Sequence, residues 1–409
     1  MKIALLHYSS PPIVGGVESV LAHHARLMAK AGHDVTIFVG RGESFDERIP
    51  VAVLPRLDSR HPDVMAVKGA LDSGQYISTF DSLRDQIKAE LLTGLRSFDV
   101  LIAHNVASLH KNLPLTAALH DAHKIRGFPH LILWHHDLAW TTPRYQDEMH
   151  DGYPWDLLRT DWGGVTHVVI SELRRKELGD LLGIPKESIR IIPNGVDVNA
   201  FFKLEAQTID FMEQLKLLDG DPLFLLPVRL TPRKNIELAL GVLAELRRRE
   251  FPQAMLLVTG PEGPHSPANA AYKQKLLTLR NELNLQGAAH FLADLTSEFM
   301  PDAVIADFYR LADALLFPSR EEGFGIPIIE AAFSGIPVFC ADIPVLHELG
   351  GEDITYFDPD AEPASVVQQI SDRLASETTS RWARRAKHIY TWNSIYKMHI
   401  GPLIQEVTR

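Results

Sequence analysis

The stretch SREEGFGIPIIEAAFSGIPV (319–338) places two glycines between a buried strand and a helix. ADALLFPS (312–319) precedes the glycines and IPVFCAD (336–342) follows the helix, and both are apolar runs of strand length. Pro327 suits the first helical turn, where a backbone N–H has no partner within the helix. Strand, glycine loop, helix and strand in this order predict a βαβ unit with a parallel sheet.

The same alternation extends upstream of this stretch. PLFLLPV (222–228) has the composition of a buried strand, and IELALGVLAELRRR (236–249) repeats apolar residues at helical spacing. AMLLVTG (254–260) is the next expected strand, followed by the turn-rich loop PEGPHSP (261–267). These elements enlarge the βαβ unit into a complete α/β domain.

The beginning of the chain predicts a second domain of the same kind. KIALLH (2–7) and DVTIFVG (34–40) are strand-length apolar runs on either side of an amphipathic helix over 17–31. Gly32 follows that helix, where a left-handed residue is needed. The predicted fold class is therefore α/β, with two separate parallel-sheet domains.

Turn residues in PNGVD (193–197) indicate the boundary between the two halves. We expect an N-terminal domain over 1–197 and a C-terminal domain over 198–391. The last stretch is rich in aromatic residues, so we expect a C-terminal helix at about 392–409 to pack back on the first domain.

Composition excludes several classes of protein. The 409 residues are 45% hydrophobic with a net charge of −11, which argues against a nucleic-acid partner because non-specific affinity for phosphate backbones needs excess Lys and Arg. One cysteine, Cys340, rules out an intrachain disulfide framework. The apolar runs fall short of the ~18 residues of a membrane span. We expect a cytoplasmic protein, either free or peripheral at a membrane.

The glycine loop is the first candidate site. Gly323 and Gly325 lie where backbone N–H groups and a helix N-terminus favour an anion. Glu330 is expected in the first turn of the following helix, where a carboxylate suits the paired hydroxyls of a ribose. Glu322 precedes the loop and is expected to point into the same cleft.

Two cations follow the strand at 222–228. Arg229 and Lys234 lie on one polar loop, at the carboxyl end of a strand. Such a pair can hold a diphosphate and stabilise the negative charge that develops as it leaves. Loop cations are usually solvent-exposed, and it is the combination of these two with the glycine loop that favours a diphosphate-binding site.

Gly15 and Gly16 open the first helix in the same manner, although a plain strand-to-helix turn also favours glycine. The pattern is not G-x-G-x-x-G, which lowers the expectation of a nicotinamide or flavin site.

His135 and His136 end the apolar run LILW and precede Asp137. A histidine at a strand end can bond to sugar hydroxyls or act as a base. No metal-ligand spacing surrounds the two histidines, and the D-x-D pairs Asp219/Asp221 and Asp358/Asp360 are interpreted as turn residues. We expect no metal and no cofactor.

These motifs together resemble glycosyltransferase family 4. The motifs that carry the resemblance are GGVE (15–18), WHHD (134–137), PNGVD (193–197), RLTPRK (229–234) and EEGFGIPIIEAAFSGIPV (321–338). The resemblance covers essentially the whole chain, and the spacing of Glu322 and Glu330 is its most specific mark. It implies the GT-B fold, in which two Rossmann-like domains face each other across a cleft.

The resemblance also implies roles for individual residues. Arg229 and Lys234 would contact the diphosphate of a nucleotide-sugar donor, and Glu330 would hold its ribose. Glu322 would meet the donor sugar. The remaining donor contacts implied are Gly15, Gly16, Gly260, Gly323, Phe324, Gly325 and Ile326. His135 matches the sugar-contacting histidine of the family, with His136 as the alternative in register.

The segment 139–162 is the candidate acceptor site. Its aromatic and basic residues could stack on a sugar ring or pair with an anionic group. Trp140, Arg144, Tyr145 and Arg159 are the candidates, together with His136. A loop that merely caps the domain is an equal alternative.

The resemblance implies a metal-independent transferase that retains the anomeric configuration. The expected reaction moves a hexose from a UDP- or GDP-sugar to a hydroxyl of a small soluble or saccharide acceptor. The main alternative is a peripheral-membrane transferase with a lipid or lipid-linked acceptor. Less favoured alternatives are a nucleotide-sugar 2-epimerase and a non-catalytic nucleotide-sugar-binding protein.

Overall fold

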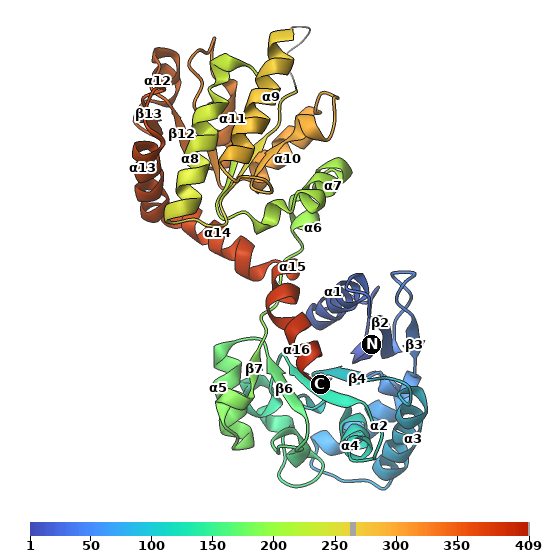
Figure 1. Cartoon of the computed structure of the whole chain (residues 1–409). Coiled ribbons are helices and arrows are strands. Elements are labelled where there is room, and N and C mark those ends of the chain that lie inside the picture. Colours follow the sequence, from blue (N-terminus) through green and yellow to red (C-terminus); the bar gives the residue numbers. More distant parts are fainter. Residues whose placement is uncertain (262–266, 408–409) are drawn as a thin grey trace. The chain divides into compact units, whose positions relative to one another are not determined.

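The computed structural model describes residues 1–261 and 267–407, which form two compact α/β units (Figure 1). Unit 1 comprises Met1–Val196 and Trp392–Arg409, and unit 2 comprises Asp197–Thr391. Each unit is built around one parallel sheet, which confirms the predicted fold class.

The sheet of unit 1 has the order β3-β2-β1-β4-β5-β6-β7 among the described residues, and each neighbouring pair is parallel. Its strands are β1 (Lys2–Ser9), β2 (Asp34–Arg41), β3 (Val51–Val53), β4 (Val100–His104), β5 (His130–His135), β6 (Thr166–Val169) and β7 (Arg190–Ile191). The order grows outward in both directions from the central pair β1 and β4.

The helices of unit 1 cover both faces of this sheet. They are α1 (Gly16–Lys30), α2 (Pro62–Asp72), α3 (Thr79–Gly94), α4 (Leu113–His123), α5 (Glu172–Leu182), α15 (Trp392–Ile395) and α16 (Gly401–Glu406), with a π-helical turn η10 (Tyr396–Ile400). Short 3-10 turns are η1 (Pro55–Leu57), η2 (His110–Asn112), η3 (Ala139–Thr141), η4 (Pro143–Glu148), η5 (Trp155–Leu158) and η6 (Lys186–Ser188).

Alternation along β5 shows how the two faces are divided. Leu131 and Leu133 pack with residues of α2, α3 and α4, whereas Ile132 and Trp134 pack with α1 and the C-terminal helices. Both faces are apolar because a parallel sheet is covered on both sides. The C-terminal segment joins this core through Trp392, whose ring stacks on His23 with centroids 5.0 Å apart.

The sheet of unit 2 has the order β10-β9-β8-β11-β12-β13 within the described residues, and it is parallel throughout. Its strands are β8 (Leu223–Leu226), β9 (Met255–Val258), β10 (Ala289–Phe291), β11 (Ala314–Phe317), β12 (Val338–Ala341) and β13 (Thr355–Phe357). The central pair is β8 and β11, so this order also grows outward on both sides.

The helices of unit 2 include the two that follow the candidate site loops, α8 and α11. They are α6 (Val198–Phe202), α7 (Ala206–Gln214), α8 (Ile236–Arg249), α9 (Pro267–Glu282), α10 (Asp302–Leu311), α11 (Ile326–Ser334), α12 (Pro344–Gly350), α13 (Pro363–Ser376) and α14 (Thr378–Tyr390). The 3-10 turns are η7 (Leu217–Asp219), η8 (Pro232–Lys234) and η9 (Leu292–Asp294).

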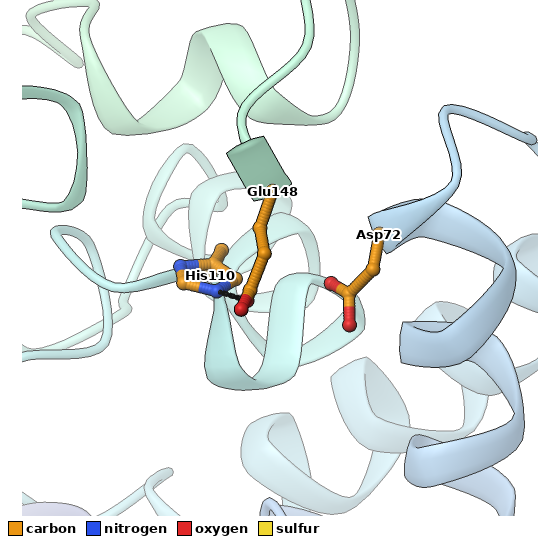
Figure 2. A group of neighbouring side chains, drawn as sticks. All are labelled: Asp72, His110 and Glu148. Atoms are coloured by element: carbon orange, nitrogen blue, oxygen red, sulfur yellow. Dashed lines mark hydrogen bonds and ion pairs between the residues drawn. The ribbon is translucent and has the colours of Figure 1, made fainter. Parts of the chain in front are cut away.

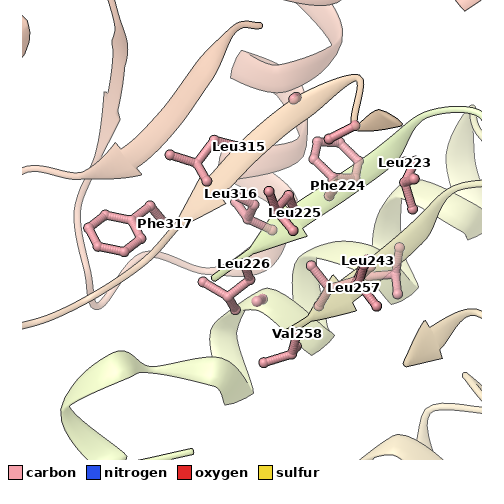
Figure 3. Packing of buried hydrophobic residues seen from close by; sticks show 14 of the residues in the cluster. Leu223, Phe224, Leu225, Leu226, Leu243, Leu257, Val258, Leu315, Leu316 and Phe317 are labelled. Atoms are coloured by element: carbon pink, nitrogen blue, oxygen red, sulfur yellow. The ribbon is translucent and has the colours of Figure 1, made fainter. Parts of the chain in front are cut away.

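The core of unit 2 lies around β8, β9 and β11. Figure 3 shows consecutive residues of β8, from Leu223 to Leu226, among side chains of β9, β11 and α8. All four are buried, which explains why this strand is an unbroken apolar run and not an alternating one.

A buried carboxylate fixes the start of the central strands. Asp313, just before β11, accepts a hydrogen bond from the Leu223 N–H at 2.7 Å. Its other oxygen lies 2.7 Å from the Lys387 ammonium, which also donates to the Leu311 carbonyl at 3.1 Å. These contacts tie α14 to the amino end of the sheet, opposite to the loops that follow β8 and β11.

Most elements agree with the sequence pattern, and the differences occur at strand ends. The predicted helix over 236–249 is α8, and Gly32 is left-handed with φ 86°. The strand predicted over 222–228 is shorter, because Pro227 cannot donate a ladder hydrogen bond. Of the loop expected over 261–267, residues 262–266 lie outside the described residues. In the part of the chain that the structure describes, no helix is both long and apolar enough to cross a bilayer.

Candidate functional site

The carboxyl ends of β8 and β11 form the candidate site of unit 2. These two strands are neighbours, and strand order reverses between them, which is where open parallel sheets bind ligands. A pocket of about 280 Å³ lies at this edge. It is lined by Pro227, Val228, Arg229, Thr259, Gly260, Pro261, Phe299, Met300, Asp302, Ile305, Ile326, Pro327 and Glu330.

Four of the predicted donor residues line this pocket, namely Arg229, Gly260, Ile326 and Glu330. Arg229 is exposed, and no acidic side chain among the described residues pairs with its guanidinium. It is therefore available for an anionic ligand. Phe299, which sequence reasoning missed, adds an apolar wall that is 70% exposed.

Glu330 lies just past the first turn of its helix, where it was predicted, because the helix begins one residue earlier than expected. The helix α11 begins at Ile326, with Pro327 as its second residue, so Glu330 falls in the second turn. Its carboxylate still reaches the pocket, and the phenol of Tyr309 hydrogen-bonds to it. Tyr309 on α10 is buried and also bonds to the Pro327 carbonyl at 3.2 Å.

The Tyr309 phenol stays protonated. Burial, together with the bond to the Glu330 carboxylate, raises the pKa of Tyr309. A neutral phenol thus lies beside the Glu330 carboxylate. In the sequence this tyrosine looks like a core residue of an amphipathic helix, so the pattern gives no signal of its contact.

Lys234 and Glu322 form an ion pair beside the pocket. The Lys234 ammonium donates to the Glu322 carboxylate, and both side chains are only about one-tenth exposed. The ammonium also lies 5.5 Å from the centre of the Phe317 ring. The charge of Lys234 is therefore already compensated, in contrast to that of Arg229, and removal of either partner would leave a buried unpaired charge.

The glycines near the pocket differ in what their backbone positions require. Gly260 passes so close to the loop that follows β8 that a Cβ would lie 2.1 Å from the Val228 carbonyl oxygen. Gly325 has φ 101°, which favours glycine. Gly323 has neither constraint, since a Cβ there would meet nothing within 4 Å. Its exposed backbone has room for the close approach of a ligand.

The corresponding edge of unit 1 lies at the ends of β1 and β4, where its strand order also reverses. His7 Nδ1 is hydrogen-bonded to the His104 carbonyl at 2.9 Å, and His104 Nδ1 is hydrogen-bonded to His136 Nε2 at 3.1 Å. His135 instead bonds through Nε2 to His167 Nδ1 of β6 at 3.1 Å. The structure thus places His136, and not His135, beside the central strands.

These histidines are neutral at pH 7. Burial lowers the pKa of His136 to about 3 and that of His7 to about 4. Burial also lowers the pKa of His104 and of His135 well below the ordinary value. At neutral pH they offer hydrogen bonds and not positive charge.

The Gly15–Gly16 loop holds a carboxylate. Gly15 precedes α1 in extended conformation, and a Cβ on it would lie 2.0 Å from Glu18 Oε2. Glu18 Oε1 accepts a hydrogen bond from Ser9 Oγ at 2.7 Å. Because this carboxylate sits where the helix N-terminus favours an anion, a phosphate that reaches the loop requires Glu18 to turn away.

Two of the predicted acceptor residues are held by the protein itself. The Arg159 guanidinium lies 4.0 Å from the centre of the Trp140 ring and donates to Asp151 at 2.6 Å and to Asp156 at 2.9 Å. Trp140 donates through Nε1 to the Trp155 carbonyl at 3.2 Å. These contacts support the capping alternative for Trp140 and Arg159.

Arg144 and Tyr145 are placed differently. The Arg144 guanidinium lies 4.7 Å from the centre of the Tyr145 ring and 3.9 Å from the Asp137 carboxylate. Arg144 remains 64% exposed and lies close to the residue that follows His136. Its exposure leaves room for an anionic group beside the loose pair with Asp137.

One cluster has the composition of a metal site. Figure 2 shows Asp72, His110 and Glu148, whose ligand atoms lie within 4.8 Å of one another. The Lys68 ammonium donates to Asp72 at 2.6 Å and to Glu148 at 3.1 Å, and His110 is hydrogen-bonded to Glu148. The positive charge that these carboxylates require is thus supplied by a side chain, and the cluster ties η4 to α2.

The D-x-D pairs occupy turns, as their surroundings in the sequence predicted. Asp358 accepts a hydrogen bond from the Asp360 N–H at 2.8 Å, and Asp360 pairs with Arg320. Asp221 forms an isolated bridge with Gln253 just before β8. These contacts hold the turns together within unit 2.

Two family models match the chain, one over nearly the same residues as the first part of unit 1 and the other within unit 2. Glycosyltransferase Family 4 matches residues 14–200, and Glycosyl transferases group 1 matches residues 207–389. The chain belongs to glycosyltransferase family 4. The enzyme is thus a glycosyltransferase, and the family match agrees with the two parallel-sheet α/β units described above.

Known relatives match either the whole of this glycosyltransferase or a part of it. MMP alpha-(1->4)-mannosyltransferase of Mycolicibacterium hassiacum is 26% identical over 100% of this chain and 99% of its own length. Mannosylglucosylglycerate synthase of Petrotoga mobilis is 28% identical over 61% of each chain. The solved structure of Anabaena Alr3699/HepE in complex with UDP and glucose aligns with 99% of this chain and 100% of that chain, at 20% identity and a TM-score of 0.38.

Alanine substitutions should separate the structural glycine of the pocket from the accessible one. Gly260→Ala forces a Cβ into the backbone of Val228 and Arg229 and should lower the free energy of unfolding by about 1–3 kcal/mol. Gly323→Ala meets no atom, so it should change stability by no more than about 0.5 kcal/mol while reducing turnover. Denaturation and initial rates measure both effects, and equal losses of stability would contradict this distinction.

Acid should destabilise unit 1 through its buried histidines. Below pH ~6.5 the unfolded chain takes up protons that the folded histidines, with lowered pKa values, do not. The free energy of unfolding should therefore fall as the pH drops from about 6.5 towards 3, by about 1.4 kcal/mol per pH unit for each such histidine. Tryptophan fluorescence reports the transition, because unit 1 contains Trp134, Trp140, Trp155, Trp162 and Trp392.

His24→Leu provides the matched variant for this measurement. Neither ring nitrogen of His24 has a hydrogen-bond partner among the described residues, and burial lowers the pKa of His24 to about 3. In this variant the free energy of unfolding should depend less on pH, by about the contribution of one histidine, and should be unchanged at pH 7.5. An unchanged pH dependence in His24→Leu would show that these histidines are not its source.

Proposed function

We propose that this enzyme transfers a hexose, with mannose the first sugar to test, from a nucleoside-diphosphate sugar to a hydroxyl group of a small polar acceptor. Unit 2 binds the nucleotide, and unit 1 binds hydroxyl groups. The reaction retains the anomeric configuration and requires no metal ion.

The pocket at the ends of β8 and β11 carries this proposal. It combines an unpaired cation, Arg229, with a carboxylate, Glu330, and with exposed apolar side chains such as Phe299. A nucleoside diphosphate has the matching parts: a diphosphate for the cation, ribose hydroxyls for the carboxylate and a flat base for the apolar wall. The Tyr309 phenol lies beside this carboxylate.

The identity of the sugar is proposed from the relatives. Their names include a mannosyltransferase and a mannosylglucosylglycerate synthase, and the first of them is similar over the whole of this chain. The second name also points to a small, polar, anionic acceptor. Arg144, exposed near Asp137, is the side chain that we assign to such an anionic group.

Charge stabilisation explains how transfer can proceed without a metal. The bond between the anomeric carbon and the diphosphate oxygen breaks, the acceptor oxygen bonds to that carbon, and the acceptor proton leaves with the diphosphate. Arg229 can stabilise the negative charge as it develops. Lys234 can contribute after its carboxylate partner, Glu322, turns to the sugar hydroxyls.

His136 is the histidine that we assign to the sugar. It lies at the strand-order reversal of unit 1 and is neutral, which suits a hydrogen bond to a hydroxyl better than to a phosphate. His135 is hydrogen-bonded to His167, so we propose His136, the alternative to His135, as the sugar-contacting histidine.

A donor panel tests the proposed activity. We expect GDP- or UDP-linked mannose or glucose to be turned over with a small hydroxylated acid as acceptor, at the same rate in excess EDTA. Release of the nucleoside diphosphate gives the rate, and NMR of the new anomeric proton gives the configuration. Inversion, loss of activity in EDTA, or epimerised donor without acceptor would each contradict the corresponding part of the proposal.

The two glutamates should differ in their effects on nucleotide binding. Glu330→Gln should weaken donor and free nucleoside diphosphate alike, because both contain the ribose. Glu322→Gln should lower turnover but bind the free nucleotide at least as tightly as the parent, since Lys234 loses its competing carboxylate. Calorimetry beside steady-state kinetics measures both.

Glu321→Gln is the matched control for this pair. Glu321 precedes Glu322 in the same loop and is exposed, so it should behave like the parent enzyme. The roles of the two glutamates must be exchanged or abandoned if Glu322→Gln loses nucleotide affinity as much as Glu330→Gln does.

A further inference from the structure

Asn105, the residue that follows β4, is held in a conformation that few residues adopt. Its φ is 59°, in the left-handed region, and its side chain is buried. Asparagine tolerates this region better than other non-glycine residues, and such strain is typically retained where the surroundings fix it. The residue lies at the strand-order reversal of unit 1.

The side chain of Asn105 bonds to the backbone beside the candidate histidine. Its Oδ1 accepts a hydrogen bond from the His136 N–H at 2.8 Å and lies 3.3 Å from the Asp137 nitrogen, which also donates to it. One amide oxygen thus holds the two residues that leave β5. The left-handed conformation is what allows the Asn105 side chain to face them.

The backbone of Asn105 is fixed independently of this contact. Its N–H donates to the Trp134 carbonyl at 2.8 Å, and its carbonyl accepts from the Leu109 N–H at 3.1 Å and from the Tyr8 hydroxyl at 3.3 Å. Asn105 therefore connects β1, β4 and β5 at one point. A change to its side chain should leave these backbone bonds in place.

His136 is held from both sides. Its backbone bonds to Asn105, and its ring bonds through Nε2 to His104. Nδ1 is then the ring atom that remains for a ligand. The position of Nδ1 depends on both hydrogen bonds. The bond from the His136 N–H to Asn105 fixes the backbone that carries the ring, and the bond from Nε2 to His104 fixes the ring itself.

We propose that Asn105 is a positioning residue for catalysis, which fixes His136 so that its Nδ1 meets a hydroxyl group of the sugar substrate. The proposal rests on the function assigned to His136 above. It predicts that the oxygen acceptor of residue 105 controls turnover, separately from the left-handed backbone and from stability.

Three substitutions separate these contributions. Asn105→Asp keeps an oxygen acceptor, Asn105→Gly keeps the positive φ but has no acceptor, and Asn105→Ala loses both. We expect Asn105→Gly to lower kcat about ten- to a hundred-fold with little change in the donor KM, since a misplaced group costs rate more than binding. Asn105→Asp should keep most of the rate.

Asn284→Gly is the matched control. Asn284 has φ 55°, is exposed in a turn of unit 2 and lines neither candidate site. The substitution is chemically the same and should leave kcat unchanged. If Asn105→Gly does not fold, Asn105→Ser takes its place, since its hydroxyl is too short to bridge both amides.

Hydrogen exchange gives a readout that does not depend on activity. The His136 and Asp137 amides should exchange about tenfold faster in Asn105→Gly than in the parent or in Asn105→Asp. Equal exchange and equal kcat in all variants would overturn the proposal, as would equal loss of kcat in Asn105→Asp and Asn105→Gly. If His136→Ala keeps full turnover, the assigned function of His136 fails; if it loses turnover while Asn105→Gly does not, only the role of Asn105 fails.

Discussion

In both sheets of this enzyme the first strand of the chain lies in the interior of the sheet, and this topology positions the candidate sites. In each unit the chain lays down strands on one side of the first strand and then returns to add strands on the other. Right-handed crossovers then place the helices that follow the two central strands on opposite faces, which opens a crevice at the carboxyl ends. Arg229 and Glu330 line the pocket at this place in unit 2, and His7, His104 and His136 gather there in unit 1.

The two crevices differ in the charge of the side chains that line them. In unit 1, burial keeps the histidines neutral, so this region offers directional hydrogen bonds to neutral hydroxyl groups. In unit 2, Arg229 stays exposed and unpaired among the described residues, while Lys234 is compensated by Glu322. In the proposed donor site, Arg229 is thus open to a diphosphate, and Lys234 becomes so only when Glu322 is released. The difference follows from burial, because a charge without a partner is costly only where water is excluded.

Local sequence patterns predicted the parts of the site that depend on neighbouring residues. The glycine loop at 323–325 and the helix at 236–249 follow from spacing and composition, and both are present. Glu330 lies one residue further along its helix than predicted, just past the first turn, because a proline fixes a helix start only to within a residue or two. The choice between His135 and His136 stayed open since a shift of one residue at a strand end reverses the face of the sheet.

Contacts between distant segments were beyond reach of the sequence alone. Tyr309 looked like a core residue, and Asn105 was not singled out, because the partners of each lie on other elements. The aromatic segment at 139–162 shows the converse: its composition suggested ligand binding, yet Arg159 stacks on Trp140 and the polar groups of both are bonded within the fold. Composition indicates what a side chain can bind, and only packing determines whether the protein itself already occupies it.

A crystal structure of the enzyme with a bound nucleoside diphosphate tests the central claim most directly. We expect the nucleotide at the ends of β8 and β11, with its ribose hydroxyls within about 2.6–3.2 Å of the Glu330 carboxylate and its diphosphate in contact with the Arg229 guanidinium. A nucleotide bound away from these strands, or one whose ribose makes no contact with Glu330, would contradict it.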